Sequence, residues 1–213
     1  MQLKSDQMRL TQKERNWLPW FGINGKFALG WSCFVNKSTY PAVEQTFEGI
    51  AATRVKLLQN WTTAQWEQLE SLATLISLDD FSNQTAKLNY AKQSAIDFSE
   101  LFIVDTNGQI LCSTYQRRVG TRHKETRALE QGLKAQFLHG PFIDRDTLEI
   151  GPSTSKFHDE VTLMFYQPIT QNGQVIAVLC GRVPNDVLGD LIQREAGHIY
   201  RESGDNYLFM VDS

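Results

Sequence analysis

The spacing of apolar residues changes along the chain, from a helical period in the first half to strand-like runs in the second. From Ser38 to Leu78, apolar residues recur mostly at steps of three and four, which is the spacing of one helix face. We expect one long helix there that begins near Pro41, because Ser38 or Thr39 can cap it and proline suits a first turn. A shorter helix is predicted over residues 83–96.

The apolar stripe of the long helix leaves two interpretations open. About forty residues of helix span about 60 Å, which exceeds the width of a domain of this size. Either the stripe packs on the chain's own sheet, or part of it pairs with the same helix of a second copy to form a homodimer. The stripe consists of Val43, Phe47, Ile50, Ala51, Val55, Leu58, Trp61, Leu69, Leu72, Ala73 and Ile76.

Two hairpins are predicted in the second half of the chain. Residues 100–105 and 109–114 are apolar runs that flank an Asn-Gly turn at Asn107. Residues 161–169 and 174–183 flank a second Asn-Gly turn. Because local hairpins pair antiparallel, we predict an α+β domain with a single antiparallel sheet built from these four segments.

The connections between the hairpins have weaker patterns. We expect a helix over 122–134, an irregular segment over 138–160 and a short strand over 148–150. A closing helix is predicted over 185–200. The chain thus reads as long helix, two strands, helix, irregular segment, two or three strands and helix.

One phrase of the sequence occurs twice. Leu101-Phe102-Ile103-Val104-Asp105 returns as Leu208-Phe209-Met210-Val211-Asp212, just before the last residue, Ser213. The second copy lacks a return strand, so we interpret the chain as cut where a second copy of the same domain begins, the alternative being coincidence. The expected domains are an arm or degenerate membrane anchor over 1–37, two helices over 38–98, the module that contains the predicted sheet over 99–184, and a linker helix with the first strand of a truncated second module over 185–213.

Composition narrows the function classes. A net charge of −3 over 213 residues gives no electrostatic case for nucleic acid as a partner. The segment Trp17–Val35 has about the length of a membrane span, but Pro19, Asn24 and Lys26 interrupt it. We interpret it as a buried or interfacial arm, and a degenerate membrane anchor stays as the alternative.

No catalytic or metal-binding motif is recognisable. Cys33, Cys112 and Cys180 lack metal-ligand spacing, and a disulfide between the last two is left open. His139 and His158, with Asp144 and Asp159, show no helical spacing for a metal site, and His123 and His198 read as surface residues. Nucleophile triads and phosphate-loop fingerprints are not found either, so neither enzyme activity nor a cofactor is predicted.

Four short motifs together resemble a Cache domain, the PAS-like sensor fold of bacterial chemoreceptors. They are Pro141-Phe142-Ile143-Asp144, the run 161–169, the run 172–181 that begins Asn172-Gly173, and Asp186-Val187-Leu188. The resemblance covers roughly residues 38–213 and is to the membrane-distal half of the double Cache sensor region of a methyl-accepting chemotaxis protein. It implies an inner-membrane receptor with a periplasmic sensor region, and a cytoplasmic version stays open.

The chain departs from the amino-acid-sensing members of that family. Their Arg-x-Trp-Tyr phrase is replaced by Lys124-Glu125-Thr126-Arg127, and the Tyr of their Pro-Tyr-Ile-Asp phrase is Phe142. Their amine-binding Asp, placed by its spacing from the Asn-Gly turn, is Arg182 here. We therefore predict a ligand with an anionic group, because a guanidinium grips carboxylate or phosphate bidentately.

Arg182 is the first anchor of the predicted ligand site. The supporting residues are Tyr115, Arg117, Arg118, Phe142, Asp144, His158 and Tyr166. The alternative is that Arg182 lies at the surface, or pairs internally with Asp144 or Asp186. The polar loop Gly151–Asp159 either cradles an anion or is held by its own Ser and Thr turns.

Three functions are compatible with these observations. The first is the ligand-sensing region of a bacterial chemotaxis-type receptor that transmits through its long helix. The second is an enzyme or enzyme subunit that acts on a small anion. The third is a dimerisation module that binds nothing. The predicted partners are a small molecule and a second copy of the chain, in a parent receptor anchored in the membrane.

Overall fold

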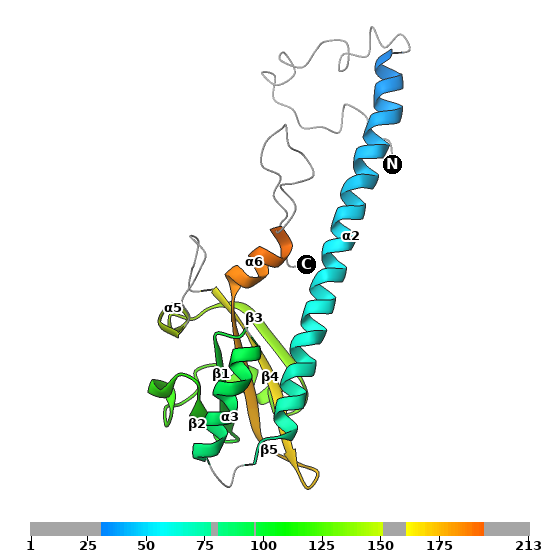
Figure 1. The fold of residues 1–213 in the computed structure, drawn as a ribbon. Helices are drawn as coiled ribbons and strands as arrows, with labels where there is room; N and C mark the ends of the chain where they lie inside the picture. Colours follow the sequence, from blue (N-terminus) through cyan, green and yellow to red (C-terminus); the bar gives the residue numbers. More distant parts are fainter. Residues whose placement is uncertain (1–30, 78–80, 96, 151–160, 194–213) are drawn as a thin grey trace. The chain divides into compact units, whose positions relative to one another are not determined.

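The computed structural model describes residues 31–77, 81–95, 97–150 and 161–193 (Figure 1). Met1–Val55 and Lys56–Ser213 are two separate units, and each is described by itself. In chain order the elements are α2 (Trp31–Thr74), α3 (Phe81–Ser94), β1 (Glu100–Asp105), β2 (Ile110–Ser113), the 3-10 helix η2 (Gln116–Arg118), α4 (Thr126–Gly132), β3 (Phe137–Ile143), α5 (Asp146–Ile150), β4 (Val161–Gln171), β5 (Gln174–Pro184) and α6 (Asn185–Gln193).

The strands form one five-stranded sheet in the order β2-β1-β5-β4-β3. Every neighbouring pair is antiparallel, so the predicted α+β class and both predicted hairpins are confirmed. The turns form where the sequence placed them, because Gly108, Asn172 and Gly173 have φ values of 87°, 53° and 79°, which suit glycine and asparagine. The long-range pairing of β1 with β5 joins the two hairpins.

Alternate residues of the strands pack on opposite faces of the sheet. On one face, Leu101 and Leu179 join a core with α2 and α3, which lie side by side in Figure 1. On the other face, Phe102 and Cys180 join a second core that includes α4. We call these the helix face and the α4 face.

An aromatic cluster holds the unit-2 part of α2, from Lys56 onward, on the helix face. The ring of Phe165 meets Trp61, Trp66 and Phe98 edge-on, with centroid distances of 5.9, 4.8 and 5.8 Å. Trp61 Nε1 donates a hydrogen bond to Asp97 Oδ2 at 2.8 Å. Within Lys56–Ser213, the apolar stripe of α2 therefore packs on the chain's own sheet, and the pairing of two copies stays a prediction.

Gly181 lets Phe98 approach β5 closely. A Cβ atom at Gly181 would lie 2.5 Å from Cε1 of Phe98, a distance that real Cβ contacts do not reach. The backbone of β5 therefore lies directly against an aromatic ring on the helix face. The next residue, Arg182, projects to the α4 face.

Two helix predictions need correction. The long helix begins at Trp31 instead of near Pro41, and α2 continues through this proline although it lacks the N–H donor. Residues 31–35 of the predicted arm are thus helical, and 17–30 lie outside the described residues. The helix expected over 122–134 is shorter, since α4 begins only at Thr126.

The segment expected to be irregular contains an edge strand and a helix. β3 was missed because Gly140 and Pro141 interrupt its pattern, and its pairing with β4 is irregular between His139 and Phe142. The strand expected over 148–150 is wrong, because these residues belong to α5. A three-residue apolar pattern does not distinguish helix from strand.

Several sequence predictions fall outside the described residues. These are the second copy of the repeated phrase at 208–212, the end of the closing helix after Gln193, His198, and the polar loop with His158 and Asp159. Cys112 and Cys180 are free thiols and belong to different cores, on opposite faces of the sheet. None of the described helices has both the length and the apolar character needed to cross a membrane.

Candidate functional site

The candidate site is a buried cluster of charged side chains around Arg182 on the α4 face. Arg182 is fully buried, and its Nη1 lies 2.7 Å from Asp144 Oδ2. The same nitrogen donates to Thr147 Oγ1 at 2.9 Å, and Nε donates to Glu100 Oε2 at 3.1 Å. Arg182 therefore does not lie at the surface, and it pairs internally with Asp144.

Glu100 is the second centre of the cluster. Its buried carboxylate accepts hydrogen bonds from Arg118 Nη1 at 2.7 Å and from Ser113 Oγ at 2.7 Å, in addition to Arg182. The guanidinium of Arg118 lies 4.7 Å from the ring centre of Phe102, a cation–π contact. Glu100 therefore joins both buried arginines.

Asp144 is shared between the buried cluster and the surface. Its Oδ1 lies 3.8 Å from Nζ of Lys124, whose side chain is exposed. Burial acts to raise the pKa of Asp144, but the charge and hydrogen bond of Arg182 outweigh it and hold that pKa below its usual value. The carboxylate is therefore ionised at neutral pH.

The charges of the cluster balance, but its hydrogen bonds do not. Two carboxylates, Glu100 and Asp144, face two guanidinium groups, Arg118 and Arg182, so the net charge is zero. Nη2 of Arg182 is buried and has no hydrogen-bond partner among the described residues. A buried donor without an acceptor costs about 1–3 kcal/mol.

His123 is a second buried group with an unused polar atom. Its Nε2 lies 3.0 Å from the hydroxyl of Tyr166, while Nδ1 has no partner among the described residues. The prediction that His123 lies at the surface is wrong, because only 4% of it is exposed. Its neighbours in sequence are polar, so no apolar pattern revealed the burial.

The ring contacts of His123 place it on the same face of the sheet as Arg182. The His123 ring lies 5.6 Å from Phe102 and 5.7 Å from Tyr166, centroid to centroid. Both residues pair with Cys180 on the strands that flank β5. Arg182 follows Cys180 by two residues on the same face of β5, and about 7 Å of strand separates these two residues.

Acidification should destabilise the fold through His123. Burial lowers its pKa to about 4, and the charges of Arg118 and Arg182 act in the same direction. Because the unfolded chain takes up this proton near pH 6.5, stability is present above that pH and is lost as the pH falls toward 4. The loss is as much as about 3 kcal/mol, since a tenfold change in proton affinity corresponds to about 1.4 kcal/mol.

Urea unfolding of the wild type and His123→Gln, followed between pH 7 and pH 4, tests this expectation. The wild type should lose more stability than the variant over that range. Equal slopes for wild type and His123→Gln would refute the assignment.

The other predicted site residues are distributed unevenly. Arg118, Asp144 and Tyr166 belong to the buried cluster or contact it. Phe142 stacks on His139 at 4.5 Å, and Tyr115 lies 3.5 Å from Glu149 at the surface. Arg117 is exposed and His158 lies outside the described residues. Sequence reasoning missed Glu100, Ser113, His123 and Thr147 as members of the cluster.

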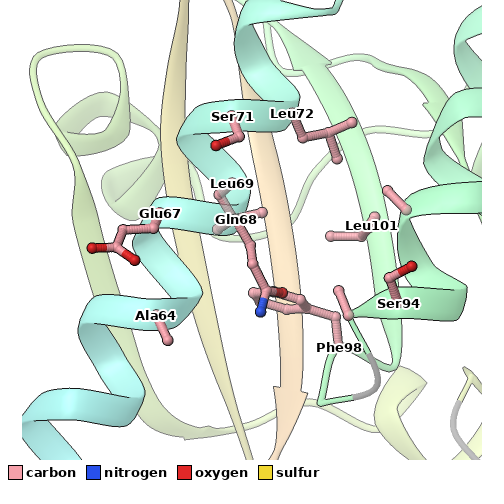
Figure 2. Close-up of a pocket in the computed structure, with 11 residues that line it drawn as sticks. Ala64, Glu67, Gln68, Leu69, Ser71, Leu72, Ser94, Phe98 and Leu101 are labelled. Carbon is pink, nitrogen blue, oxygen red and sulfur yellow. The ribbon is translucent and has the colours of Figure 1, made fainter.

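A groove of about 480 Å³ lies on the helix face, between α2 and α3 (Figure 2). Its floor is apolar, with Leu69, Phe98 and Leu101, and its polar groups are Gln68, Glu67 and serines of the two helices. The charged cluster lies on the opposite face. Because specific recognition requires convergent polar groups, we place the candidate site at the cluster and not in this groove. The described residues contain no group of histidine, cysteine and acidic side chains suited to a metal ion.

The chain is similar in fold to solved sensory domains of bacterial receptors. The ligand-binding domain of the Pseudomonas aeruginosa amino acid chemoreceptor PctC, in complex with GABA, matches with a TM-score of 0.57 and 19% identity, over 72% of this chain and 69% of that one. The sensory domain of the Campylobacter jejuni chemoreceptor Tlp3, with isoleucine bound, matches with a TM-score of 0.59 and 16% identity, over 76% and 67%. The fold is that of a chemoreceptor sensory domain. The Cache fold expected from the sequence is thereby confirmed.

The chain shares its fold with these sensory domains but has low sequence identity to them. The PctB ligand-binding domain in complex with L-Arg, from Pseudomonas aeruginosa, also matches, with a TM-score of 0.55 and 17% identity over 71% of this chain and 62% of that one. No protein-family model matches the chain. No curated protein matches it by sequence either.

Proposed function

We propose that the chain is the ligand-sensing region of a bacterial chemotaxis-type receptor, and that a small molecule binds on the α4 face at Arg182. The fold of chemoreceptor sensory domains supports this function. The observation that carries the proposal is the fully buried Nη2 of Arg182, a charged donor for which the described part of the chain supplies no acceptor. A binding role suits this nitrogen, because a ligand oxygen would satisfy it.

The proposed ligand carries an acidic group. The unused donor of Arg182 requires an oxygen acceptor, and a carboxylate provides the strongest one. His123 is proposed as the second contact, because its Nδ1 is also without a partner among the described residues. Arg118, Asp144 and Tyr166 would form the surrounding wall, with Phe142, Tyr115, Arg117 and His158 as the outer members of the predicted set.

The proposal extends to the parent receptor. We place the sensor region in the periplasm of an inner-membrane receptor and take residues 99–184 as its membrane-distal module, with 185–213 leading into a second one. Signal transmission would use α2, and two copies would associate through this helix. The similar solved structures are ligand-binding or sensory domains of chemoreceptors, which supports a receptor as the parent protein.

A binding experiment with Arg182→Lys tests the site. Lysine keeps the positive charge between Glu100 and Asp144 but lacks the fork of donors, so the fold should tolerate it better than a neutral residue. A thermal-shift screen with organic acids, amino acids, amines and purines identifies compounds that raise the melting temperature. Calorimetry with the acid that gives the largest shift should show that Arg182→Lys loses about 1.5–3 kcal/mol of binding free energy relative to the wild type.

Arg127→Lys is the matched control for this experiment. Arg127 is exposed on α4, so the same substitution there should leave the affinity unchanged. A cationic amine that binds with equal affinity to the wild type and to Arg182→Lys, while no acid binds, would refute the proposed ligand class. That result would not refute the assignment of the chain as a receptor domain, because the amine could bind elsewhere on it.

A further inference from the structure

Asp144 contacts two cations at the same time, one buried and one exposed. Arg182 Nη1 holds its Oδ2 at 2.7 Å, inside the sheet. Lys124 Nζ lies 3.8 Å from its Oδ1, and the same nitrogen is 2.9 Å from Asp146. The Lys124 side chain is 62% exposed, whereas that of Asp144 is 11% exposed. A rotation of Asp144 that breaks its contact with Arg182 would therefore leave it paired with the exposed Lys124 alone.

Charge balance favours this exchange when an acid binds. The cluster without a ligand holds two carboxylates and two guanidinium groups, which gives 2 − 2 = 0. A ligand carboxylate on Arg182 would add a third anion to a buried region, and an uncompensated buried charge is strongly unfavourable. Moving Asp144 to Lys124 restores two anions for two buried cations.

The backbone that carries Asp144 is tied to Arg182. Thr147 Oγ1 accepts from Arg182 Nη1 at 2.9 Å, and the Thr147 amide donates to the Asp144 carbonyl at 3.0 Å. α5 has only five residues, too few for a helix to be stable by itself. The position of Asp144–Ile150 therefore depends on contacts to its surroundings, and Arg182 supplies two of them.

We infer that Asp144 is an internal competitor for the ligand's acidic group. When a carboxylate binds Arg182, Asp144 moves to Lys124 and the segment Asp144–Ile150 loosens. This inference rests on the proposed function, because it presupposes an acid at Arg182. It makes Asp144 a determinant of specificity, since a ligand must outcompete a carboxylate that is already in place.

Acetate is the probe for this inference. It is titrated at pH 7 and constant ionic strength into the wild type, Asp144→Asn, Lys124→Met and Glu149→Gln, with amide chemical shifts as the readout. Asp144→Asn should bind acetate at least about tenfold more tightly, a factor equivalent to about 1.4 kcal/mol. Lys124→Met should bind it more weakly than the wild type, because Asp144 loses its alternative partner.

Glu149→Gln is the matched control. It removes one negative charge from the same short helix, but Glu149 is exposed and does not contact Arg182. Its acetate affinity should stay within about twofold of the wild type, as expected for an exposed charge. Hydrogen exchange gives a second readout, because the amides of Thr147 and Leu148 should exchange faster with acetate bound, and in Asp144→Asn without it.

The outcomes separate this inference from the proposed function. Suppose that Arg182→Lys weakens acetate binding but Asp144→Asn does not tighten it. This result would support the ligand site at Arg182 and refute the role of Asp144 as a competitor. Slower exchange of Thr147 and Leu148 with acetate would also overturn it. Acetate binding to neither the wild type nor Asp144→Asn would overturn the competitor, whereas the screen described above would still decide the receptor's ligand class.

Discussion

Arg182→Met is expected to destabilise the domain by about 3–5 kcal/mol at pH 7, because removal of one partner leaves buried carboxylates without compensation. Glu100 would keep Arg118, but Asp144 would lose its 2.7 Å partner and Thr147 its donor. Urea unfolding measures the loss. Arg127→Met, which changes an exposed arginine on α4, is the control and should alter stability little.

The loss caused by Arg182→Met should shrink in acid. In the wild type the pKa of Asp144 lies below its unfolded value, so its contribution is present at neutral pH and disappears as the pH falls through the folded pKa. Without Arg182, burial would raise that pKa, and protonation would then stabilise the variant. A stability difference that stays constant from pH 7 to pH 4 would contradict this account of the cluster.

Phe165→Ala should cost about 3–5 kcal/mol of unfolding free energy, the range for removing a buried phenylalanine. Its side chain is fully buried, and three aromatic rings meet it edge-on. Trp61 and Trp66 would lose the ring that they contact, so the wavelength of tryptophan emission should also change.

Tyr90→Ala is the control for the aromatic cluster. Tyr90 lies on α3 and is 75% exposed, so the truncation of an aromatic ring there should change stability by less than about 0.5 kcal/mol. A loss below about 1 kcal/mol for Phe165→Ala would show that α2 is held on the sheet by other contacts.

The hairpins were predictable because their information is local. Asn-Gly turns and apolar runs identify both, and their antiparallel pairing follows from the short connections. β3 was not predictable in this way. It lies at the edge of the sheet, and Gly140 and Pro141 break the alternation that marks a strand.

The site was predicted in part, and the missing part is non-local. Arg182 was identified from its place at a strand end, but its partner Glu100 is 82 residues away and faces it only through the pairing of β1 with β5. A charged residue at the start of an apolar strand was the available signal for Glu100. His123 gave no signal, because its burial results from a connection folding over the sheet.

Because Gly181 has no side chain, only the backbone of β5 separates the packed residues of the two faces at this point. The ring of Phe98 packs against one side of this strand, and the guanidinium of Arg182 forms its ion pair with Asp144 on the other. Protein interiors are close-packed and have low compressibility. Phe98 contacts Phe165, which in turn contacts Trp61 of α2, so a continuous series of direct contacts joins the two faces of the sheet through β5.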